Sequence, residues 1–160
     1  MKIARRTPGY TLIEIMVTLT IISIIFGIGY VAYREFSRRQ SLTSAIRAII
    51  GDLQLAQTQA ITGTKPKVAV CDYPNLLSGY NFEVIPPNSY KVEAVCSGGK
   101  HLVKQVNMSS SVELTAPSPN PIFFKILGQG TNVTSAVTRI DISSLGVMGS
   151  VNITSGGSIE

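Results

Sequence analysis

Residues whose types and spacing suit catalysis are sparse in this 160-residue chain. General acid–base and nucleophilic chemistry need titratable groups that converge on one place. The one histidine, His101, has a setting typical of a surface or packing residue, and the serines form no Gly-x-Ser-x-Gly nucleophile elbow. We therefore expect no catalytic residue, no cofactor and no metal site, and we interpret the chain as a non-enzyme. The acids of its second half are scattered without pairs, at Asp72, Glu83, Glu93, Glu113, Asp141 and Glu160.

Two cysteines, Cys71 and Cys96, each end a predicted strand. An even count in an exported domain favours a disulfide, and no Cys-x-x-Cys motif indicates redox catalysis or zinc. Closing the loop between them would contribute on the order of 3 kcal/mol through chain entropy. The alternative is a pair of buried thiols, because sequence spacing does not show that the two Cα atoms approach each other.

A lone carboxylate, Glu14, lies inside a long apolar run. Residues 10–33 contain this one acid and no base, and their number is what a helix needs to cross a bilayer. An acid at the centre of such a helix costs about 2.5–3.5 kcal/mol on insertion scales. We predict a transmembrane helix over residues 10–33, in which Glu14 needs either a partner or a place near the interface.

The basic charge of the chain is concentrated before this run. The net charge is +5, and three of these charges are Lys2, Arg5 and Arg6. The rest of the chain lacks the Lys/Arg clusters that track a phosphate backbone, so the charge is weak evidence for a nucleic-acid partner. Basic residues before the run favour a cytoplasmic N-terminus. The residues after the apolar run are also basic, at Arg34, Arg38 and Arg39. The charges before the run must therefore outweigh those after it if the C-terminal domain is exported.

The segment RRTPGYTLIEIMVTLTIISII, residues 5–25, resembles the class III leader of type IV pilins and pseudopilins, and the resemblance covers residues 1–33. It implies that a prepilin peptidase cuts after Gly9 on the cytoplasmic side and that Tyr10 becomes the N-methylated N-terminus. It also implies an assembly role for Glu14, which neutralises the Tyr10 amine of a neighbouring subunit and fixes the axial register. The alternative is that Glu14 lies near the interface and its side chain reaches water.

An ordinary secretory signal fits this segment less well. The apolar run is too long for a signal peptide and lacks a small-x-small cleavage site at its far end. The Pro8-Gly9 break precedes the run, so cleavage there leaves the whole apolar helix on the mature chain. We expect residues 1–9 to be a leader peptide and residues 10–33 to be an assembly helix.

An amphipathic helix is expected to follow over residues 34–63. Arg47, Asp52, Gln54 and Gln57 lie off its apolar stripe, and Gly63 followed by Pro66 is a stop signal. We adopt the simplest interpretation, which is that the stripe packs under the following domain. Its members recur at intervals of three or four, at Leu42, Ile46, Ile49, Leu53, Ala56 and Ala60.

Residues 64–160 change to a period of two, which indicates an exported β-rich domain. Polar turns separate the strands, and residues 85–89 read as a hairpin connection. The predicted fold class is α+β and pilin-like: a long N-terminal helix, transmembrane in its first half, then an antiparallel β-sandwich or sheet. Strands are expected at 67–71, 79–84, 90–96, 101–106, 121–127, 137–143 and 149–155, with a further short one at 157–159.

Three segments of this domain are similar to the GspH/FimT family of H-type minor pseudopilins and minor pilins. They are residues 52–71, 121–131 and 137–160. The resemblance implies a minor, tip-proximal subunit. Some members bind DNA through a C-terminal Gly-Arg-x-Arg motif, but neither GSVN at 149–152 nor GSIE at 157–160 has the arginines. We therefore expect no nucleic acid to bind by that route.

Together these features predict a subunit processed by prepilin peptidase and assembled with other pilins into a type II secretion pseudopilus or a type IV pilus. It would be a single-pass protein of the bacterial inner membrane, with its C-terminal domain in the periplasm before assembly. The alternative is a filament-tip receptor for DNA or another ligand, for which the available cations are Lys100, Lys104 and Lys125. A membrane-anchored enzyme is the third reading, and the lack of paired acids disfavours it.

Overall fold

The computed structural model describes residues 9–160, apart from the side chains at positions 28, 29 and 31. The expected leader therefore lies outside the described residues except for Gly9, and so do its charges Lys2, Arg5 and Arg6. The chain divides into two compact units, Met1–Ser37 and Arg38–Glu160, and each is described by itself.

The helix α1 runs from Leu12 to Thr62 and contributes to both units. Its end is marked by Gly63, whose φ of 62° suits glycine at a helix C-terminus. In the second unit the predicted apolar stripe is confirmed: every member is buried except Ile46, which packs partly buried against the same core. This stretch of α1 is therefore the helical layer of the second unit.

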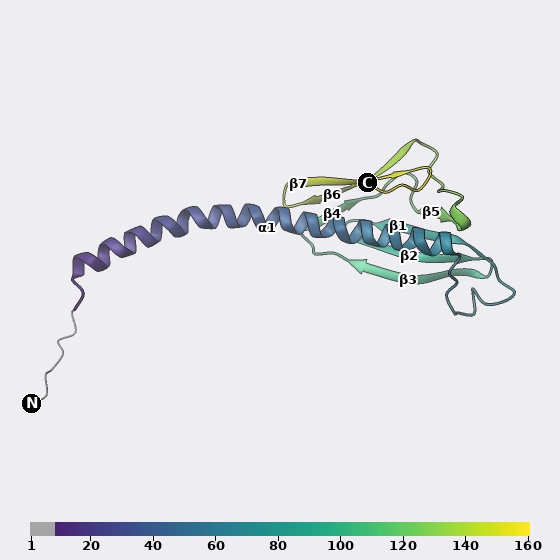
Figure 1. The fold of residues 1–160 in the computed structure, drawn as a ribbon, viewed down its shortest axis with the longest axis horizontal. Helices are drawn as coiled ribbons and strands as arrows, with labels where there is room; N and C mark the ends of the chain where they lie inside the picture. Colours follow the sequence, from purple (N-terminus) through teal and green to yellow (C-terminus); the bar gives the residue numbers. More distant parts are fainter. Residues whose placement is uncertain (1–8) are drawn as a thin grey trace, which may run out of the picture. The chain divides into compact units, whose positions relative to one another are not determined.

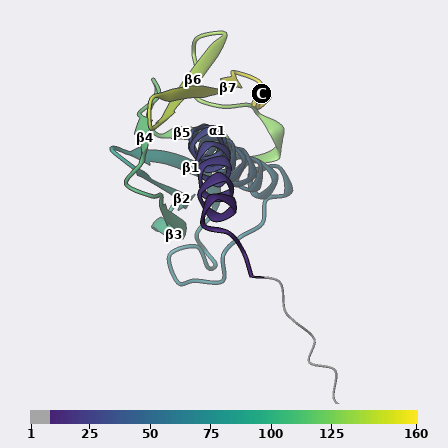
Figure 2. The same ribbon diagram turned by 90° about the vertical axis from the view of Figure 1, so that its left-hand side faces the viewer.

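Two antiparallel sheets accompany that stretch of α1 (Figure 1). Sheet A has the strand order β3-β2-β1-β5, and sheet B has the order β4-β6-β7. Figure 2 shows β1, β2 and β3 on one side of α1 and the β6–β7 hairpin on another. The expected α+β architecture, a long N-terminal helix followed by antiparallel sheets, is confirmed. The strands are β1 (Leu77–Ile85), β2 (Ser89–Cys96), β3 (Gly99–Asn107), β4 (Val112–Thr115), β5 (Ile122–Lys125), β6 (Val137–Ser144) and β7 (Val147–Thr154), and a 3-10 turn, η1 (Ile126–Gly128), follows β5.

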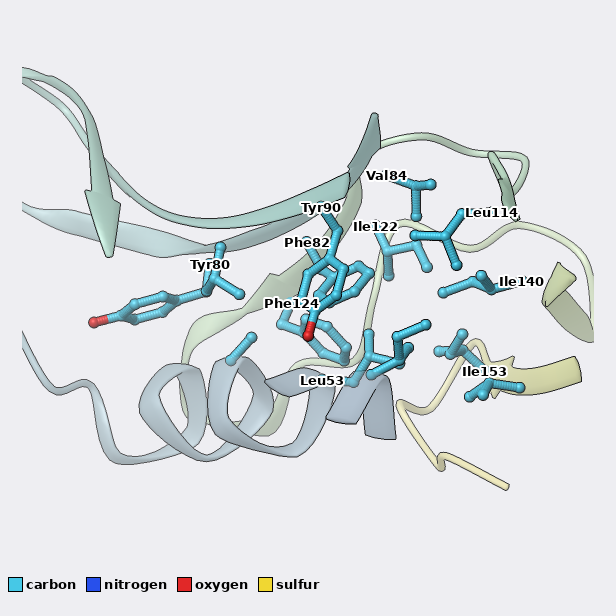
Figure 3. Close-up of a cluster of buried hydrophobic side chains, with 14 of the residues drawn as sticks. Leu53, Tyr80, Phe82, Val84, Tyr90, Leu114, Ile122, Phe124, Ile140 and Ile153 are labelled. Carbon is cyan, nitrogen blue, oxygen red and sulfur yellow. The ribbon is translucent and has the colours of Figure 1, made fainter. Parts of the chain in front are cut away.

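The core lies between α1 and the inner faces of both sheets (Figure 3). On β1 the alternating residues Tyr80, Phe82 and Val84 all point inward and are buried, as their period of two predicts. The rings of Phe82 and Tyr90 stack with centroids 5.0 Å apart. A fully buried aromatic side chain of this kind contributes about 1.5–3 kcal/mol of transfer free energy.

Three expectations about strands need correction. Residues 67–71 are not a strand: the amide N–H groups of Cys71 and Asp72 both donate to the carbonyl of Val68, at 2.9 Å each, which makes turns. Strand β4 was not predicted, because only two of its four residues are apolar. The expected strand at 157–159 is reduced to a single bridge between Ile153 and Ile159.

Candidate assembly segment

The start of α1 is set by a threonine cap. Gly9, Tyr10 and Thr11 precede the helix without regular structure, and the Oγ1 atom of Thr11 accepts the N–H of Glu14 at 3.3 Å. A threonine followed three residues later by glutamate, ahead of an apolar run, is the sequence pattern of a capping box. Sequence reasoning missed Thr11, although this pattern was its signal. The cap leaves the Gly9–Tyr10 peptide bond outside the helix.

Glu14 is an exposed acid in the first turn of α1. A negative charge at this end is favourable, because the free N–H groups of a helix N-terminus carry partial positive charge. Within residues 9–160 its carboxylate takes part in no hydrogen bond or ion pair. The structure therefore holds Glu14 and Tyr10 at the same end of the helix and leaves the carboxylate open to a partner from outside the described chain.

Three hydroxyl side chains of this segment differ from Glu14, because they are satisfied inside the helix. Each hydroxyl donates to a backbone carbonyl three or four residues earlier, at 2.8–2.9 Å. Such bonds remove the cost of placing a hydroxyl in hydrocarbon. The residues concerned are Thr18, Thr20 and Ser23. Glu14 therefore differs from these three residues, because its carboxylate oxygens still need a partner.

The rest of the segment is an uncovered apolar surface. All described side chains from Tyr10 to Tyr33 are exposed within the chain. Among the described residues, one helix, α1, is long and apolar enough to cross a membrane. At the far end of the segment the guanidinium of Arg34 lies over the ring of Tyr30, 5.8 Å from its centroid. Tyrosine and arginine at this position are typical of a membrane–water interface.

Cys71 and Cys96 form a disulfide, with their Cα atoms 5.3 Å apart. The sequence left two alternatives open, a disulfide and a pair of buried thiols, and the structure has the disulfide. Cys96 ends β2, whereas Cys71 lies in the turns between α1 and β1, so the bond fastens this connection to sheet A. Asn75 supports the same junction, because its side-chain oxygen accepts the hydroxyl of Ser97 at 3.4 Å.

Asp52 links α1 to sheet A. It was expected to lie off the apolar stripe of the helix, and the structure corrects this by placing it in the buried layer. Its carboxylate is buried, with 7% of the residue exposed, and accepts hydrogen bonds from the hydroxyl of Tyr90 at 2.8 Å and the Nζ of Lys104 at 2.7 Å. Burial, and secondly the hydrogen bond to Asp52, raise the pKa of Tyr90 above its ordinary value. A buried charge needs such partners, and here they come from β2 and β3.

Two acids that were expected to be scattered converge on Lys91. The Nζ of Lys91 lies 2.9 Å from Glu93 and 3.1 Å from Glu83. Glu83 is opposite Lys91 on β1, and Glu93 is two residues after Lys91 on β2. The hydrogen bonds to Glu93 and Glu83 raise the pKa of Lys91. A lysine held in its charged form between two carboxylates is an ion-pair cluster of the sheet surface and is unsuited to act as a base.

His101 lines a cavity of about 170 Å³ with residues that include Gln59, Lys65 and Tyr80. No acid is among the lining residues, so the histidine has no carboxylate to orient it there. The hydroxyl of Tyr80 donates to the carbonyl of Thr64 at 2.5 Å, and burial raises the pKa of Tyr80. Among residues 9–160, no three His, Cys, Asp or Glu side chains gather in a way that could hold a metal ion.

Comparison with known proteins bears on the N-terminal segment. A family model of the prokaryotic N-terminal methylation motif matches residues 4–30. No curated protein and no solved structure matches the chain. The matched motif includes Gly9, Tyr10, the Thr11 cap and Glu14, and it ends within the apolar helix. The motif supports a type IV pilin-like prepilin, processed by prepilin peptidase and assembled with other pilins.

Proposed function

We propose that this chain is a pilin or pseudopilin subunit whose N-terminal segment is its assembly element. Prepilin peptidase cuts after Gly9, and Tyr10 becomes the methylated N-terminus. Residues 10–33 hold the chain in the inner membrane, with the β-rich unit on the periplasmic side, until the subunit enters a filament. The observation that carries this proposal is the capped start of α1, which leaves the Gly9–Tyr10 bond outside the helix beside the unpaired carboxylate of Glu14.

In the filament, Glu14 meets the Tyr10 amine of a neighbouring subunit. Both charges are costly in apolar surroundings when each is alone, and each satisfies the other when paired. Only one position along the helix axis brings the two together, so the pair sets the register between subunits. The internally bonded hydroxyls of Thr18, Thr20 and Ser23 cannot supply this register, because their hydrogen bonds are complete within one chain.

The finer assignment is a minor, tip-proximal subunit of a type II secretion pseudopilus or a type IV pilus. It is supported by the resemblance of residues 52–71, 121–131 and 137–160 to the GspH/FimT family. Deletion of the gene in its host, with scoring of filament number and filament length, tests this position. A tip subunit lowers the number of filaments, whereas a bulk subunit removes the filament material itself.

The assembly role is tested by Glu14→Ala, with Thr18→Ala as a matched control on the same face one turn further along. Membrane insertion should persist or improve in Glu14→Ala, because an acid is removed from an apolar helix. Cleavage after Gly9 should persist, since the peptidase acts at the junction. Leaving the amine alone costs about 3–5 kcal/mol, which corresponds to a loss of about a hundredfold or more in assembly.

The measurement is the share of each variant in sheared filaments and in membranes, beside the parent chain. Thr18→Ala should match the parent, because its hydroxyl bonds only to its own helix. Equal incorporation of Glu14→Ala and parent into filaments would show that the carboxylate merely reaches water at the interface, and the register role would be withdrawn.

A further inference from the structure

The β6–β7 hairpin lies along α1 with its turn directed toward the N-terminal end of the second unit (Figure 1). Just beyond the end of β7, the carbonyl of Gly157 accepts a hydrogen bond from Nε2 of Gln57 at 3.0 Å. Nearer the turn, a Cβ built on Gly149 would lie 2.6 Å from Cδ1 of Ile46 and 3.6 Å from Cδ2 of Leu42. The contacts on α1 therefore move from residue 57 to residue 42 as the hairpin approaches its turn.

The turn itself has an unexpected residue. Ser144 and Val147 form the closing pair, so the loop has two residues, Leu145 with φ 50° and Gly146 with φ 87°. A two-residue turn with positive φ at both positions favours Asn-Gly or Asp-Gly. Leucine is strained there and adds no hydrogen bond, and its side chain is 55% exposed. Neither the turn nor the core therefore explains Leu145, and retained strain of this kind points to function.

Leu145 is part of an apolar tip. Met148, three residues further on, is 84% exposed. We call Leu145 and Met148 the hairpin tip. Glu113 of β4 is opposite Ser143, which in turn is opposite Met148. Arg38 lies one turn before Leu42 on the same face of α1. The tip thus has two exposed apolar side chains, and Arg38 is a cation on the stretch of α1 that leads toward it.

The length of the connecting chain limits how far this tip can lie from the membrane surface. Leu42, which lies against the hairpin near its turn, is nine positions after Tyr33, the end of the apolar segment. These nine steps span about 14 Å as a helix and at most about 30 Å fully extended. A protein partner is disfavoured, because two side chains cover far less than the roughly 1,200 Å² of a stable protein interface. A small apolar tip suffices beside an existing anchor, which keeps it at a high effective concentration.

We propose that Leu145 and Met148 insert into the interfacial layer of the bilayer, with Arg38 beside the lipid phosphates. The hairpin tip is then a second membrane contact of the subunit before it enters a filament. This inference rests on the proposed anchorage by residues 10–33. It explains why an apolar residue occupies a turn position that disfavours it, and it holds the β-rich unit against the membrane by two points of the chain.

Tryptophan provides the test, because the chain contains none. The variants are Leu145→Trp and Met148→Trp, the second at a position without positive φ. The matched control is Leu127→Trp, since Leu127 is also exposed, at 71%, and has φ 55°. Leu127 lies in η1, and the next residue, Gly128, lines a cavity together with Gln57. The control is therefore near residue 57 of α1, whereas the hairpin approaches residue 42 near its turn. Each full-length variant is reconstituted in vesicles of phosphatidylethanolamine and phosphatidylglycerol that contain phosphatidylcholine brominated near the carbonyl groups.

Leu145→Trp and Met148→Trp are expected to emit at shorter wavelength than Leu127→Trp and to be quenched several-fold more strongly by the brominated lipid. Equal quenching at all three positions, in chains that float with the vesicles, would overturn the hairpin contact and leave the anchorage standing. Chains that fail to float would overturn the anchorage and, with it, the hairpin contact. A blue shift that grows with protein density without bromine quenching would assign the tip to a second copy of the chain.

Discussion

Replacing Asp52 by alanine tests how α1 is held against sheet A. The change removes the acceptor of both the Tyr90 hydroxyl and the Lys104 ammonium. Lys104 is 46% exposed and can turn to water, so its loss costs about 0–1 kcal/mol. Tyr90 is 1% exposed and keeps a hydroxyl without a partner, which costs about 1–3 kcal/mol. Asp52→Ala should therefore lower the free energy of unfolding of the second unit by about 2 kcal/mol.

The sign of the coupling between the two residues is the sharper test. Tyr90→Phe alone removes one hydrogen bond and should cost about 1 kcal/mol, because Lys104 still pairs with Asp52. In the double variant Asp52→Ala/Tyr90→Phe the orphaned hydroxyl is absent. The double variant should therefore be about 1 kcal/mol more stable than Asp52→Ala alone, a non-additivity that a double-mutant cycle isolates.

Pulse proteolysis of the full chain in detergent, over a series of urea concentrations, gives the fraction of folded second unit for each variant. Asp72→Ala is the matched control, because this acid is exposed in the turns before β1 and should change stability by less than about 0.5 kcal/mol. If the double variant loses as much as the two single variants together, the buried hydrogen bonds of Asp52 do not hold the helix in the way derived from the structure.

Three further outcomes follow from the second unit. Replacing Cys71 and Cys96 by serine opens a loop with a sequence separation of 25 and should cost about 3.5 kcal/mol in the same urea series; a loss below about 1 kcal/mol would contradict the bond. The pKa of Tyr90 is raised on folding, so its stabilisation is full below about pH 10 and is lost as the pH rises toward the folded-state pKa. Urea midpoints of the parent should therefore fall above about pH 10 more steeply than those of Tyr90→Phe, and parallel curves would refute this. Leu145→Asn should raise stability by about 1 kcal/mol, because asparagine tolerates the left-handed turn position, and a destabilised variant would speak against the strain of Leu145.

Local periodicity was enough to predict the elements that present one face to the core. The stripe of α1 and the alternation on β1 and β2 report burial directly, because the side-chain period of each element is fixed by its backbone geometry. The hairpin connection between β1 and β2 was predicted from the turn residues at 85–89, and the structure places Val84 opposite Tyr90. Such signals depend only on neighbours within a few residues.

Features that depend on distant residues were missed or mistaken. Val68 and Val70 alternate as in a strand, yet they pack partly buried against the core from turns fastened by Cys71. The sequence left a sandwich of two sheets and a single sheet as alternatives, because β4 pairs with β6 across a long stretch of chain. Asp52 seemed to be a solvent-facing residue, since its partners Tyr90 and Lys104 follow it by 38 and 52 positions.

At the N-terminus the motif of Gly9, Tyr10 and Glu14 was visible in the sequence, because it is local. What the structure adds is the boundary of the helix. The Oγ1 atom of Thr11 accepts the N–H of Glu14 and caps the helix, so α1 begins at Leu12. The unusual turn residue Leu145 was not identified, since only the backbone shows that its φ is positive.

We propose that this chain is cut after Gly9 and assembles from a new N-terminus at Tyr10. The most direct measurement is the intact mass of the protein purified from its native membrane, with the N-terminal peptide sequenced by fragmentation. We expect a chain of residues 10–160 that carries one methyl group on the amine of Tyr10. A chain that still begins at Met1, or one cut beyond residue 33, would contradict it.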